Sequence, residues 1–577
     1  MIILGLNVTH GDSSACLIVN GKLVAAAEEE RFTRIKHSSE FPFQAIDFCL
    51  KFANIDIKKI NIISVNSKFT YNLFYKFIFF LKNPGILLSL NNQYSVAVKK
   101  RNIIKELSNF YNTSFNAKIF SVPHHLSHVY STLFFLEENN NSIVFSFDGS
   151  GNFSTIESYL VTKNKIKLIK KNTFPHSLGF FYTAFSQFIG FEKYGDEYKF
   201  MGLAAYGKPI YYDLLKKIII NIDPFKLDLS FFNLPVVNYS NNTPTINKLY
   251  SAKLKNLFTQ KFNFKEINYE SQISKDIAAS VQKIFNEVVI IHLKKIKEKY
   301  NSKKIYITGG CALNSVLIGK VIESKIFENV SVGPNPGDAG GAVGSAFYVC
   351  EQNKIKIDAE QNKVFLGPTF SNEEIKKTII NQILNDSNYK ISFYEDFSDL
   401  SKKAAELIKL EYIIFWFQDR MEWGPRALGN RSILANPAIK NIKEFINKQI
   451  KKREPFRPFA ISILQELANK NFYMNENISP NMNIVFKVKE ELKTLYPDIV
   501  HADGTTRVQT VSEKDNPKLY SLLSEFYKIT GNEMIINTSM NIESPIALSP
   551  DHAWDIFQNT DVKSLVLNSW LIQKVNH

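Results

Sequence analysis

The chain has 577 residues, which is enough for roughly two to four domains with cores of their own. Hydrophobic residues make up 45% of the sequence and charged residues 22%, the proportions of an ordinary globular protein. The formal net charge of +15 has two interpretations, a polyanionic or phosphate-rich partner, or a composition biased toward Lys, Asn, Ile and Phe. We favour the bias, because the basic residues are scattered and no lysine run is longer than three.

The cysteines and the apolar segments argue against a disulfide-rich, secreted or membrane-spanning protein. None of the four cysteines belongs to a CxxC pair, which argues against a disulfide framework or a structural zinc and fits a reducing cytoplasm. The N-terminus has no basic region, so we do not expect a signal peptide. The most apolar segment, 69–90, is interrupted by Lys76, Lys82 and Pro84 and cannot span a bilayer. We expect a buried or capping helical insertion there, with a surface groove for an apolar substrate as the alternative.

Short apolar runs separated by polar turns open the chain. Residues 2–7 predict a strand, THGDSS a turn and ACLIV a second strand, and Asn20-Gly21 closes a hairpin into residues 22–30. This opening resembles that of the sugar-kinase, Hsp70 and actin superfamily, in which the amides of the turn face a nucleotide phosphate. Because the pattern returns at residues 142–163, we predict a duplicated fold of two α/β halves with a nucleotide cleft between them.

The sequence PHHLSHVYST is the strongest candidate for part of a metal site. His124 and His128 are four residues apart, so on a helix they lie on one face, about 6 Å apart, and can bind one ion. Asp148 in FSFDGSGN and Asp338 in VGPNPGDAGG both fall in predicted turns. Two imidazoles and two carboxylates suit a divalent transition metal such as Fe²⁺, Mn²⁺ or Zn²⁺. His125, three residues before His128, is an alternative ligand that a helix also allows.

A long helix and a glycine turn follow in the middle of the chain. Residues 271–300 have helical periodicity, and residues 303–320 predict a strand, a glycine turn and a helix. Gly309 and Gly310 let the backbone come close to a ligand, usually an adenine or a ribose, and a plain tight turn is the alternative. Residues 351–364 are polar, and we expect a domain boundary there.

Basic and amide side chains beside turns characterise the rest of the chain. They gather in four segments: 418–437, 447–464, 501–511 and 534–550. Guanidinium groups bind phosphate and carboxylate in a bidentate way. Basic residues that converge from separate segments would form a pocket for a dianion or a nucleotide, whereas a single arginine more often belongs to a surface ion pair.

Ten motifs, in order along essentially the whole chain, resemble the O-carbamoyltransferase family that includes nodulation protein NodU, CmcH and TobZ. The motifs are LGLNVTHGDSSACLI, AAEEERFTRIKHSSEFP, HHLSH, FDGSG, KFMGLAAYGKP, TGGCALN, PNPGDAGGAVGSA, RMEWGPRALGNRSILANP, KKREPFRPFA and NTSMN.

The resemblance implies an α/β enzyme of two fused parts. Residues 1–355 are similar to TsaD, a carbamoyl-transfer domain with the actin-like duplicated fold, and residues 356–577 are similar to the α/β domain YrdC, which forms a carbamoyl-type adenylate. The implied enzyme is an ATP-dependent carbamoyltransferase that makes carbamoyladenylate from carbamoyl phosphate and ATP, with Mg²⁺. It then transfers the carbamoyl group to a hydroxyl group of a small-molecule or sugar acceptor.

The resemblance also carries over residues of the activation site. The YrdC-like signature is present as Lys451-x-Arg453 and Ser539-x-Asn541. The residues expected to hold carbamoyl phosphate and the adenylate are Arg426, Lys451, Arg453, Arg457, Arg507, Asn537, Ser539 and Asn541. The arginines and the lysine would bind phosphates, and the amides and the hydroxyl would orient the carbamoyl group or the ribose.

The transfer site is expected in the N-terminal part. The metal ligands carried over are His124, His128, Asp148 and Asp338, with Fe²⁺ preferred over Mn²⁺ and Zn²⁺. TsaD-type enzymes have a tyrosine in place of Asp148. His125 would then donate to a carboxylate or a backbone carbonyl.

Further residues are expected around the metal. The transfer-site candidates are His10, Asp12 and Lys36, with His10 as a base or orienting group for the acceptor hydroxyl. The candidates for contact with adenosine are Gly309, Gly310 and Asn314, and those for contact with the acceptor are Asp196, Glu197 and Lys199.

The acceptor is the least defined part of the prediction. Residues 67–115 and 210–265 carry few motifs, so we expect the acceptor there, stacked on Phe and Tyr side chains. We favour a sugar hydroxyl, in a surface glycan or a glycosylated secondary metabolite such as an antibiotic. The alternatives are a tRNA threonylcarbamoyladenosine-type enzyme and a non-enzymatic ATP-binding scaffold. Because activation and transfer share one chain, we expect a cytoplasmic small-molecule enzyme without specific nucleic-acid binding or membrane insertion, and leave a homodimer open.

Overall fold

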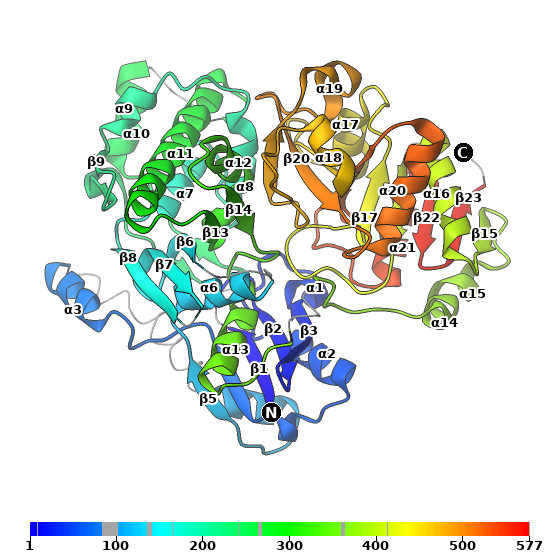
Figure 1. The fold of residues 1–577 in the computed structure, drawn as a ribbon, viewed down its shortest axis with the longest axis horizontal. Coiled ribbons are helices and arrows are strands. Elements are labelled where there is room, and N and C mark those ends of the chain that lie inside the picture. The colour runs from blue at the N-terminus through cyan, green and yellow to red at the C-terminus, as the bar shows by residue number, and fades with distance from the viewer. Residues whose placement is uncertain are drawn as a thin grey trace. The chain divides into compact units, whose positions relative to one another are not determined.

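The computed structural model describes most of the chain (Figure 1): residues 1–8, 10–83, 102–135, 141–163, 165–239, 242–262, 268–358, 364–411 and 413–575. Its internal contacts divide the chain into two compact units, Met1–Asn362 and Lys363–His577. The expected boundary at residues 355/356 lies shortly before this division, and the functional identity of the two parts stays a prediction.

A five-stranded sheet opens the first unit. β1 (Ile2–Asn7), β2 (Ser14–Val19) and β3 (Lys22–Glu28) form an antiparallel meander. β4 (Ile62–Val65) and β5 (Lys118–Ser121) add to it in parallel, so the strand order is β3-β2-β1-β4-β5. The strands and the hairpin predicted for the N-terminus are confirmed.

The second sheet repeats the arrangement of the first. β6 (Ser142–Gly151), β7 (Ser154–Thr162) and β8 (Lys165–Thr173) form a meander, and β13 (Lys304–Thr308) and β14 (Asn329–Val332) follow in parallel. Its order, β8-β7-β6-β13-β14, matches the first sheet strand for strand. The repeat that the sequence predicted at residues 142–163 is therefore a repeat of a whole α/β half.

One helix from each half packs on the sheet of the other half. α6 (His124–Phe134) follows β5 but contacts β6 and β13, and α13 (Gly340–Gln352) follows β14 but contacts β1 and β4. The two helices also contact each other closely. The close approach requires Gly344, because a Cβ there would lie 1.8 Å from the carbonyl oxygen of Ser127. These two helices join the two halves.

A helical layer covers the second half. α11 (Gln272–Tyr300) begins after Ser271, whose Oγ accepts a hydrogen bond from the amide of Ser274, and it ends at Asn301 with φ 45°. It confirms the helix predicted at residues 271–300. The helices that contact it are α7 (Leu178–Phe188), α8 (Glu197–Ala204), α9 (Tyr212–Lys216) and α12 (Ser315–Glu323).

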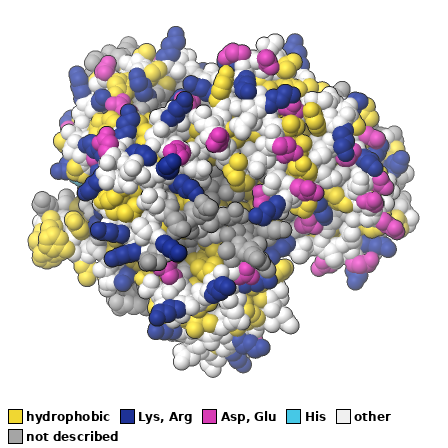
Figure 2. Space-filling model, in the orientation of Figure 1, with side chains coloured by type: hydrophobic (Ala, Val, Ile, Leu, Met, Phe, Trp, Pro, Cys, Tyr) yellow, Lys and Arg dark blue, Asp and Glu magenta, His cyan; other side chains and the backbone are white. Residues whose placement is uncertain are grey.

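The apolar segment 69–90 forms a turn at residues 69–72 and a helix at residues 73–82. α3 (Leu73–Lys82) lies in it, and residues 84–101 are outside the described part of the chain. One side of α3 exposes Leu73, Phe74 and Phe77, which form part of the yellow patch at the left edge of Figure 2. Within the described residues, no helix is long and apolar enough to cross a membrane.

A nine-stranded mixed sheet forms the second unit, in the order β15-β23-β22-β16-β17-β21-β18-β20-β19. Its strands are β15 (Tyr389–Phe393), β16 (Ile413–Phe417), β17 (Arg431–Ala435), β18 (Ala460–Leu464), β19 (Ile484–Lys487), β20 (Thr505–Val511), β21 (Met534–Ser539), β22 (Ser564–Leu567) and β23 (Trp570–Lys574). α16 (Phe397–Glu411) and α20 (Pro517–Thr530) pack together on this sheet over buried Trp416 and Leu434. The chain as a whole is mixed α/β, as predicted.

Candidate metal centre and anion site

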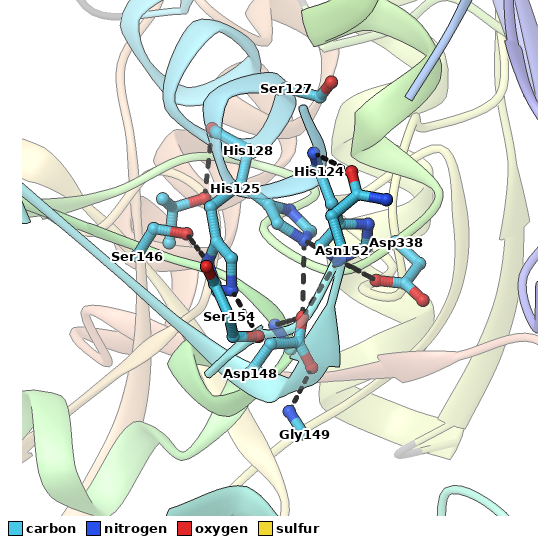
Figure 3. Close-up of polar contacts among 12 residues, drawn as sticks. His124, His125, Ser127, His128, Ser146, Asp148, Gly149, Asn152, Ser154 and Asp338 are labelled. Carbon is cyan, nitrogen blue, oxygen red and sulfur yellow. Dashed lines mark hydrogen bonds and ion pairs between the residues drawn. The ribbon is translucent and has the colours of Figure 1, made fainter. Parts of the chain in front are cut away.

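The helix α6 presents two histidines to the second sheet. Its first residue, His124, donates its backbone N–H to Oδ1 of Asn152 at 2.8 Å, which satisfies a group that a helix leaves free. One turn later comes His128, and the Nε2 atoms of the two rings lie 3.0 Å apart. Both side chains are almost completely buried. The expected helical pair is confirmed in this geometry (Figure 3).

Asp148 faces these rings from the end of β6. The sequence predicted a turn at this position, but the structure continues the strand to Gly151, with the pairing to β7 interrupted between Phe147 and Gly151. This irregularity turns the carboxylate toward α6, where Oδ2 lies 3.3 Å from Nε2 of His128. The amide of Gly310 donates to the same oxygen at 2.9 Å and holds the carboxylate in place.

Asp338 completes the cluster from the turn before α13. Its Oδ1 lies 3.4 Å from Nε2 of His124 and 3.5 Å from Nε2 of His128. One ligand atom from each of His124, His128, Asp148 and Asp338 lies within 4.8 Å of the others. Tetrahedral coordination with bonds of about 2.1 Å has ligand-to-ligand edges of about 3.4 Å, so the side chains fit a small divalent ion such as Zn²⁺ or Fe²⁺.

The charges of the cluster also fit a divalent cation. Burial would lower the pKa of His124, but the charge of Asp338 and hydrogen bonds to both carboxylates raise it to about 10. Burial would raise the pKa of Asp148, but hydrogen bonds from the two histidines hold it well below its usual value. Both shifts show that the cluster favours positive charge beside its carboxylates, which a divalent ion would supply on binding.

His125 points away from the cluster. Its Nε2 donates to the carbonyl oxygen of Ser154 at 3.1 Å, so Nδ1 accepts from the hydroxyl of Ser146 at 2.8 Å. Burial lowers the pKa of His125 to about 4, which keeps the ring neutral. The contact with a backbone carbonyl is the one expected for a residue beside the ligands, and the alternative pair of His125 with His128 is not brought together.

Four guanidinium groups meet in the second unit. Arg507 lies on β20, and burial together with the charges of Arg426, Arg453 and Arg457 lowers its pKa well below the usual value. Burial and Arg457 likewise lower the pKa of Arg426 to about 10. The Nε atoms of Arg426 and Arg507 are buried and have no hydrogen-bond partner among the described residues. A cluster of like charges with unused donors is an anion site in chemical terms.

A buried lysine lies in the same unit. Nζ of Lys451 contacts the carbonyl oxygen of Ser539 at 2.6 Å and both oxygens of Asn541, the carbonyl at 2.8 Å and Oδ1 at 2.7 Å. Only 2% of Lys451 is exposed. The two halves of the expected Lys-x-Arg and Ser-x-Asn signature, 88 residues apart, therefore meet.

Family descriptions match both units. The description "Carbamoyltransferase N-terminus" matches residues 2–347, and "Carbamoyltransferase C-terminus" matches residues 405–574. The chain belongs to the carbamoyltransferase family. It is therefore a transferase, and the resemblance found in the ten motifs is confirmed.

Relatives of this carbamoyltransferase match over its full length. Nodulation protein NolNO of Sinorhizobium fredii is 32% identical, over 98% of this chain and 80% of that protein. The uncharacterized proteins sll1178 of Synechocystis and MJ1051 of Methanocaldococcus jannaschii are 34% and 30% identical, over at least 96% of each chain. Among solved structures, the activator of 2-hydroxyisocaproyl-CoA dehydratase from Clostridium difficile matches 61% of this chain and 96% of its own, with 13% identity and a TM-score of 0.33.

The three expected transfer-site residues of the carbamoyltransferase occupy different surroundings. The ring centroid of His10 lies 5.9 Å from that of His124, which places His10 beside the metal cluster. Asp12 accepts a hydrogen bond from Nδ1 of His37 at 2.8 Å. The side chain of Lys36 is exposed. The assignment of a catalytic role to these three residues stays a prediction.

The sequence motifs did not indicate His37 as a site residue. Burial would lower its pKa, but the charge of Asp12, the hydrogen bond to it, and the charges of Glu30 and Glu197 raise it to about 9. Asp12, Glu30 and His37 form a second group of acidic and histidine side chains. The motif RIKH contains a signal for it, because His37 directly follows Lys36, which was predicted to lie in the transfer site.

The glycine turn after β13 makes contacts within the protein that the fold requires. A Cβ on Gly309 would lie 2.1 Å from the carbonyl oxygen of Phe147, and φ at this glycine is 91°. Asn314 caps α12 by accepting from the amide of Leu317 and also pairs with Gln282. The expected contact of Gly309, Gly310 and Asn314 with adenosine stays a prediction.

Other expected residues have partners of their own. Asp196 and Lys199 form an ion pair at 3.0 Å, and Glu197 accepts from Thr183 at 2.6 Å. Asn537 is completely buried in β21, where its Nδ2 donates to Ser462 and Gln509. A direct contact of Asn537 with the substrate would require its other amide atom, Oδ1, which has no partner among the described residues.

Proposed function

We propose that the chain is an ATP-dependent O-carbamoyltransferase that works in two steps. First, water attacks carbamoyl phosphate and releases inorganic phosphate and carbamate. A carbamate oxygen then bonds to the α-phosphorus of ATP, and pyrophosphate leaves. Second, an acceptor hydroxyl bonds to the carbamoyl carbon of the adenylate and loses its proton to a base, and the bond to AMP breaks.

The observation that carries the first step is the arginine cluster of the second unit. Arg507 and Arg426 hold unused buried donors, and their mutual repulsion with Arg453 and Arg457 is relieved when phosphates bind. Lys451 lies between Ser539 and Asn541 and fixes the turn after β21. We assign this site to carbamoyl phosphate and ATP, with Mg²⁺ accompanying the nucleotide.

The metal cluster supports the second step. His124, His128, Asp148 and Asp338 would hold the ion, which when bound supplies Lewis-acid polarisation of the carbamoyl carbonyl. His10 lies beside His124 and would accept the proton of the acceptor hydroxyl. The repeated halves of the first unit support an actin-like fold, in which the nucleotide part of the adenylate binds between the halves.

Pyrophosphate release by the purified full-length chain tests the proposal. With ATP, Mg²⁺ and a divalent transition metal present, we expect release that depends on carbamoyl phosphate and precedes addition of any acceptor. No release, either alone or with pools of hydroxyl-bearing acceptors, would overturn the activation step. Release only when acceptors are present would agree with the proposed reaction and would show that acceptor binding controls the first step.

A further inference from the structure

A cavity of about 540 Å³ lies in the first unit, outside the groups assigned so far. Its walls come from α3, from the hairpin β6–β7, from residues 173–181 and from residues 227–235. This volume is within the range of about 300–1,000 Å³ of small-molecule sites. Parts of both segments in which the acceptor was expected, 67–115 and 210–265, line it; residues 84–101, 240–241 and 263–267 are outside the described chain.

Aromatic rings form the main wall of the cavity. Phe79 of α3 lies 5.3 Å from Phe153 and 5.2 Å from Phe174, measured between ring centroids. Phe153 and Phe174 lie 5.2 Å apart, and Phe180 stands edge-on to Phe174 at 6.4 Å. Such rings offer apolar faces and edges to a flat or ring-shaped ligand.

Among the described residues, the lining contains no Asp, Glu, Lys or Arg side chain. Its histidine, His176, accepts from the amide of Leu227 at Nδ1, and burial lowers its pKa, so the ring is neutral. Among the described residues of the lining, none carries a charge that would balance a phosphate or another anion desolvated here. The cavity therefore suits neither ATP nor carbamoyl phosphate, and it suits an uncharged apolar group.

The same wall lies next to the metal cluster. Phe180 packs on Gly149, the residue after the ligand Asp148, since a Cβ on that glycine would lie 3.0 Å from the ring. Phe153 follows Asn152, whose side chain accepts the amide of the ligand residue His124. A molecule in the cavity therefore lies beside the strand and the loop that position two of the four ligands.

We propose that this cavity binds the apolar part of the acceptor, an aromatic or alicyclic group that does not react, while its hydroxyl group extends to the metal cluster. The inference rests on the proposed carbamoyl transfer. It narrows the acceptor class to molecules with an apolar aglycone and disfavours purely polar glycans.

Binding can be measured without turnover. The neutral aromatic dye N-phenyl-1-naphthylamine gains fluorescence in apolar sites, and we expect saturable binding to the full chain. 2-Naphthyl β-D-glucopyranoside should displace the dye, whereas methyl β-D-glucopyranoside and ATP at the same concentration should not. Displacement by all three compounds, or by none, would overturn the proposal.

Two variants on one helix give a matched comparison. Phe79→Ser removes a cavity wall, and we expect dye affinity to fall about tenfold, the effect of losing burial against one aromatic ring. Phe77→Ser changes a ring on α3 that is 63% exposed and does not line the cavity, so affinity should stay unchanged. The reverse result would place the dye on the exposed side of α3 and overturn the proposal.

A variant that fills the cavity, together with the pyrophosphate assay, distinguishes failure of the cavity assignment from failure of the proposed function. Leu229→Trp reduces the cavity from its rim and should also weaken the dye and the naphthyl glycoside. All three variants should retain pyrophosphate release that depends on carbamoyl phosphate, because that step is assigned to the second unit. Circular dichroism and thermal unfolding like those of the wild type show that the altered first unit folds. If the wild-type chain binds the naphthyl glycoside but releases no pyrophosphate, the proposed function fails and the acceptor role fails with it. Release without any binding of the naphthyl glycoside overturns the cavity assignment alone.

Discussion

Two hydrogen bonds tie the metal cluster to the rest of the fold. Gly310 fixes Asp148 by its amide, and Asn152 fixes the start of α6 at His124. The Nδ1 atoms of His124 and His128 are buried without a hydrogen-bond partner among the described residues, so their Nε2 atoms are the ones directed at the carboxylates. The rings are therefore oriented mainly by packing and by the shared charge.

The buried lysine and the metal ligands should affect different half-reactions. Lys451→Ala removes an ammonium group that organises Ser539 and Asn541, and we expect carbamoyl phosphate-dependent pyrophosphate release to fall at least about 100-fold. Transfer from chemically supplied carbamoyladenylate should persist. The neighbouring exposed residue provides a control, Lys452→Ala, which should retain both activities. Normal pyrophosphate release by Lys451→Ala would contradict the assignment.

The converse is expected for the histidine ligands. His128→Ala removes one of the four side chains proposed to bind the metal, so the chain should lose bound metal and transfer from carbamoyladenylate should fall by at least about 100-fold. Pyrophosphate release should remain. Metal content, measured by elemental analysis, checks the reason for the loss. A folded variant that loses both half-reactions would be inconsistent with two separate sites.

The Asp12–His37 pair predicts a pH-dependent contribution to stability. The pKa of His37 is raised from 6.5 to about 9 because Asp12, Glu30 and Glu197 outweigh burial, so the stabilisation is complete below pH 6.5 and is lost as the pH rises through 9. We expect His37→Gln to lower the unfolding temperature most at pH 6, less at pH 8 and hardly at pH 10. A difference that grows with pH would contradict the ion pair. His176→Gln, whose ring pKa is lowered, is the control without this trend.

At the scale of elements, α6 and α13 act as a pair, because each carries part of the cluster on the sheet of the opposite half. α6 supplies His124 and His128, and the turn before α13 supplies Asp338. Their contact depends on small residues, since Gly344 of α13 lies against the backbone of α6. Helix packing and ligand placement are thus one structural requirement.

The helix contact can be tested by adding a single methyl group. Gly344→Ala brings a Cβ into the carbonyl of Ser127, and we expect a loss of about 1–3 kcal/mol in the free energy of unfolding. The matched control is Gly337→Ala, where the nearest atom would be 3.9 Å away, and its effect should be small. Calorimetry of both variants measures the difference. Equal stability of the two variants would contradict the close approach of the helices.

At the scale of the whole molecule, the net charge of +15 bears on the alternative of a tRNA-modifying enzyme. Lys and Arg side chains are scattered over the face in Figure 2 and form no continuous stripe there among the described residues. Scattered cations bind nucleic acid weakly and without sequence preference.

We therefore expect tRNA and an unrelated RNA of equal length to bind equally. Their dissociation constants should be about 10⁻⁴–10⁻⁶ M and should rise by a factor of about ten or more between roughly 50 and 200 mM salt. Filter binding or fluorescence anisotropy measures both. Tight binding of tRNA alone, persisting at the higher salt concentration, would favour the alternative function.

The amino-acid sequence alone predicts the local elements and the chemical types of the site residues. The spacing of His124 and His128 predicted one helical face, and residues 271–300 predicted α11, because both depend on the period of a helix. The repeat at residues 142–163 indicated the second half because short apolar runs and polar turns are likewise visible in a local stretch of sequence. The family could also be identified from the sequence, because each of the ten motifs is a short continuous segment and their order is fixed along the chain.

Contacts between residues far apart in the chain become visible only in the folded structure. Asp338 meets His124 because a helix of each half packs on the sheet of the other half. The order of the strands brings Lys451 to Asn541 and gathers the four arginines. No local sequence pattern encodes either arrangement. The pairing of Asp12 with His37 is a further case, and so is the aromatic cavity next to the cluster. Local propensity acts over a few residues, whereas a site is assembled by the burial of elements far apart in sequence, and that assembly becomes visible only in the fold.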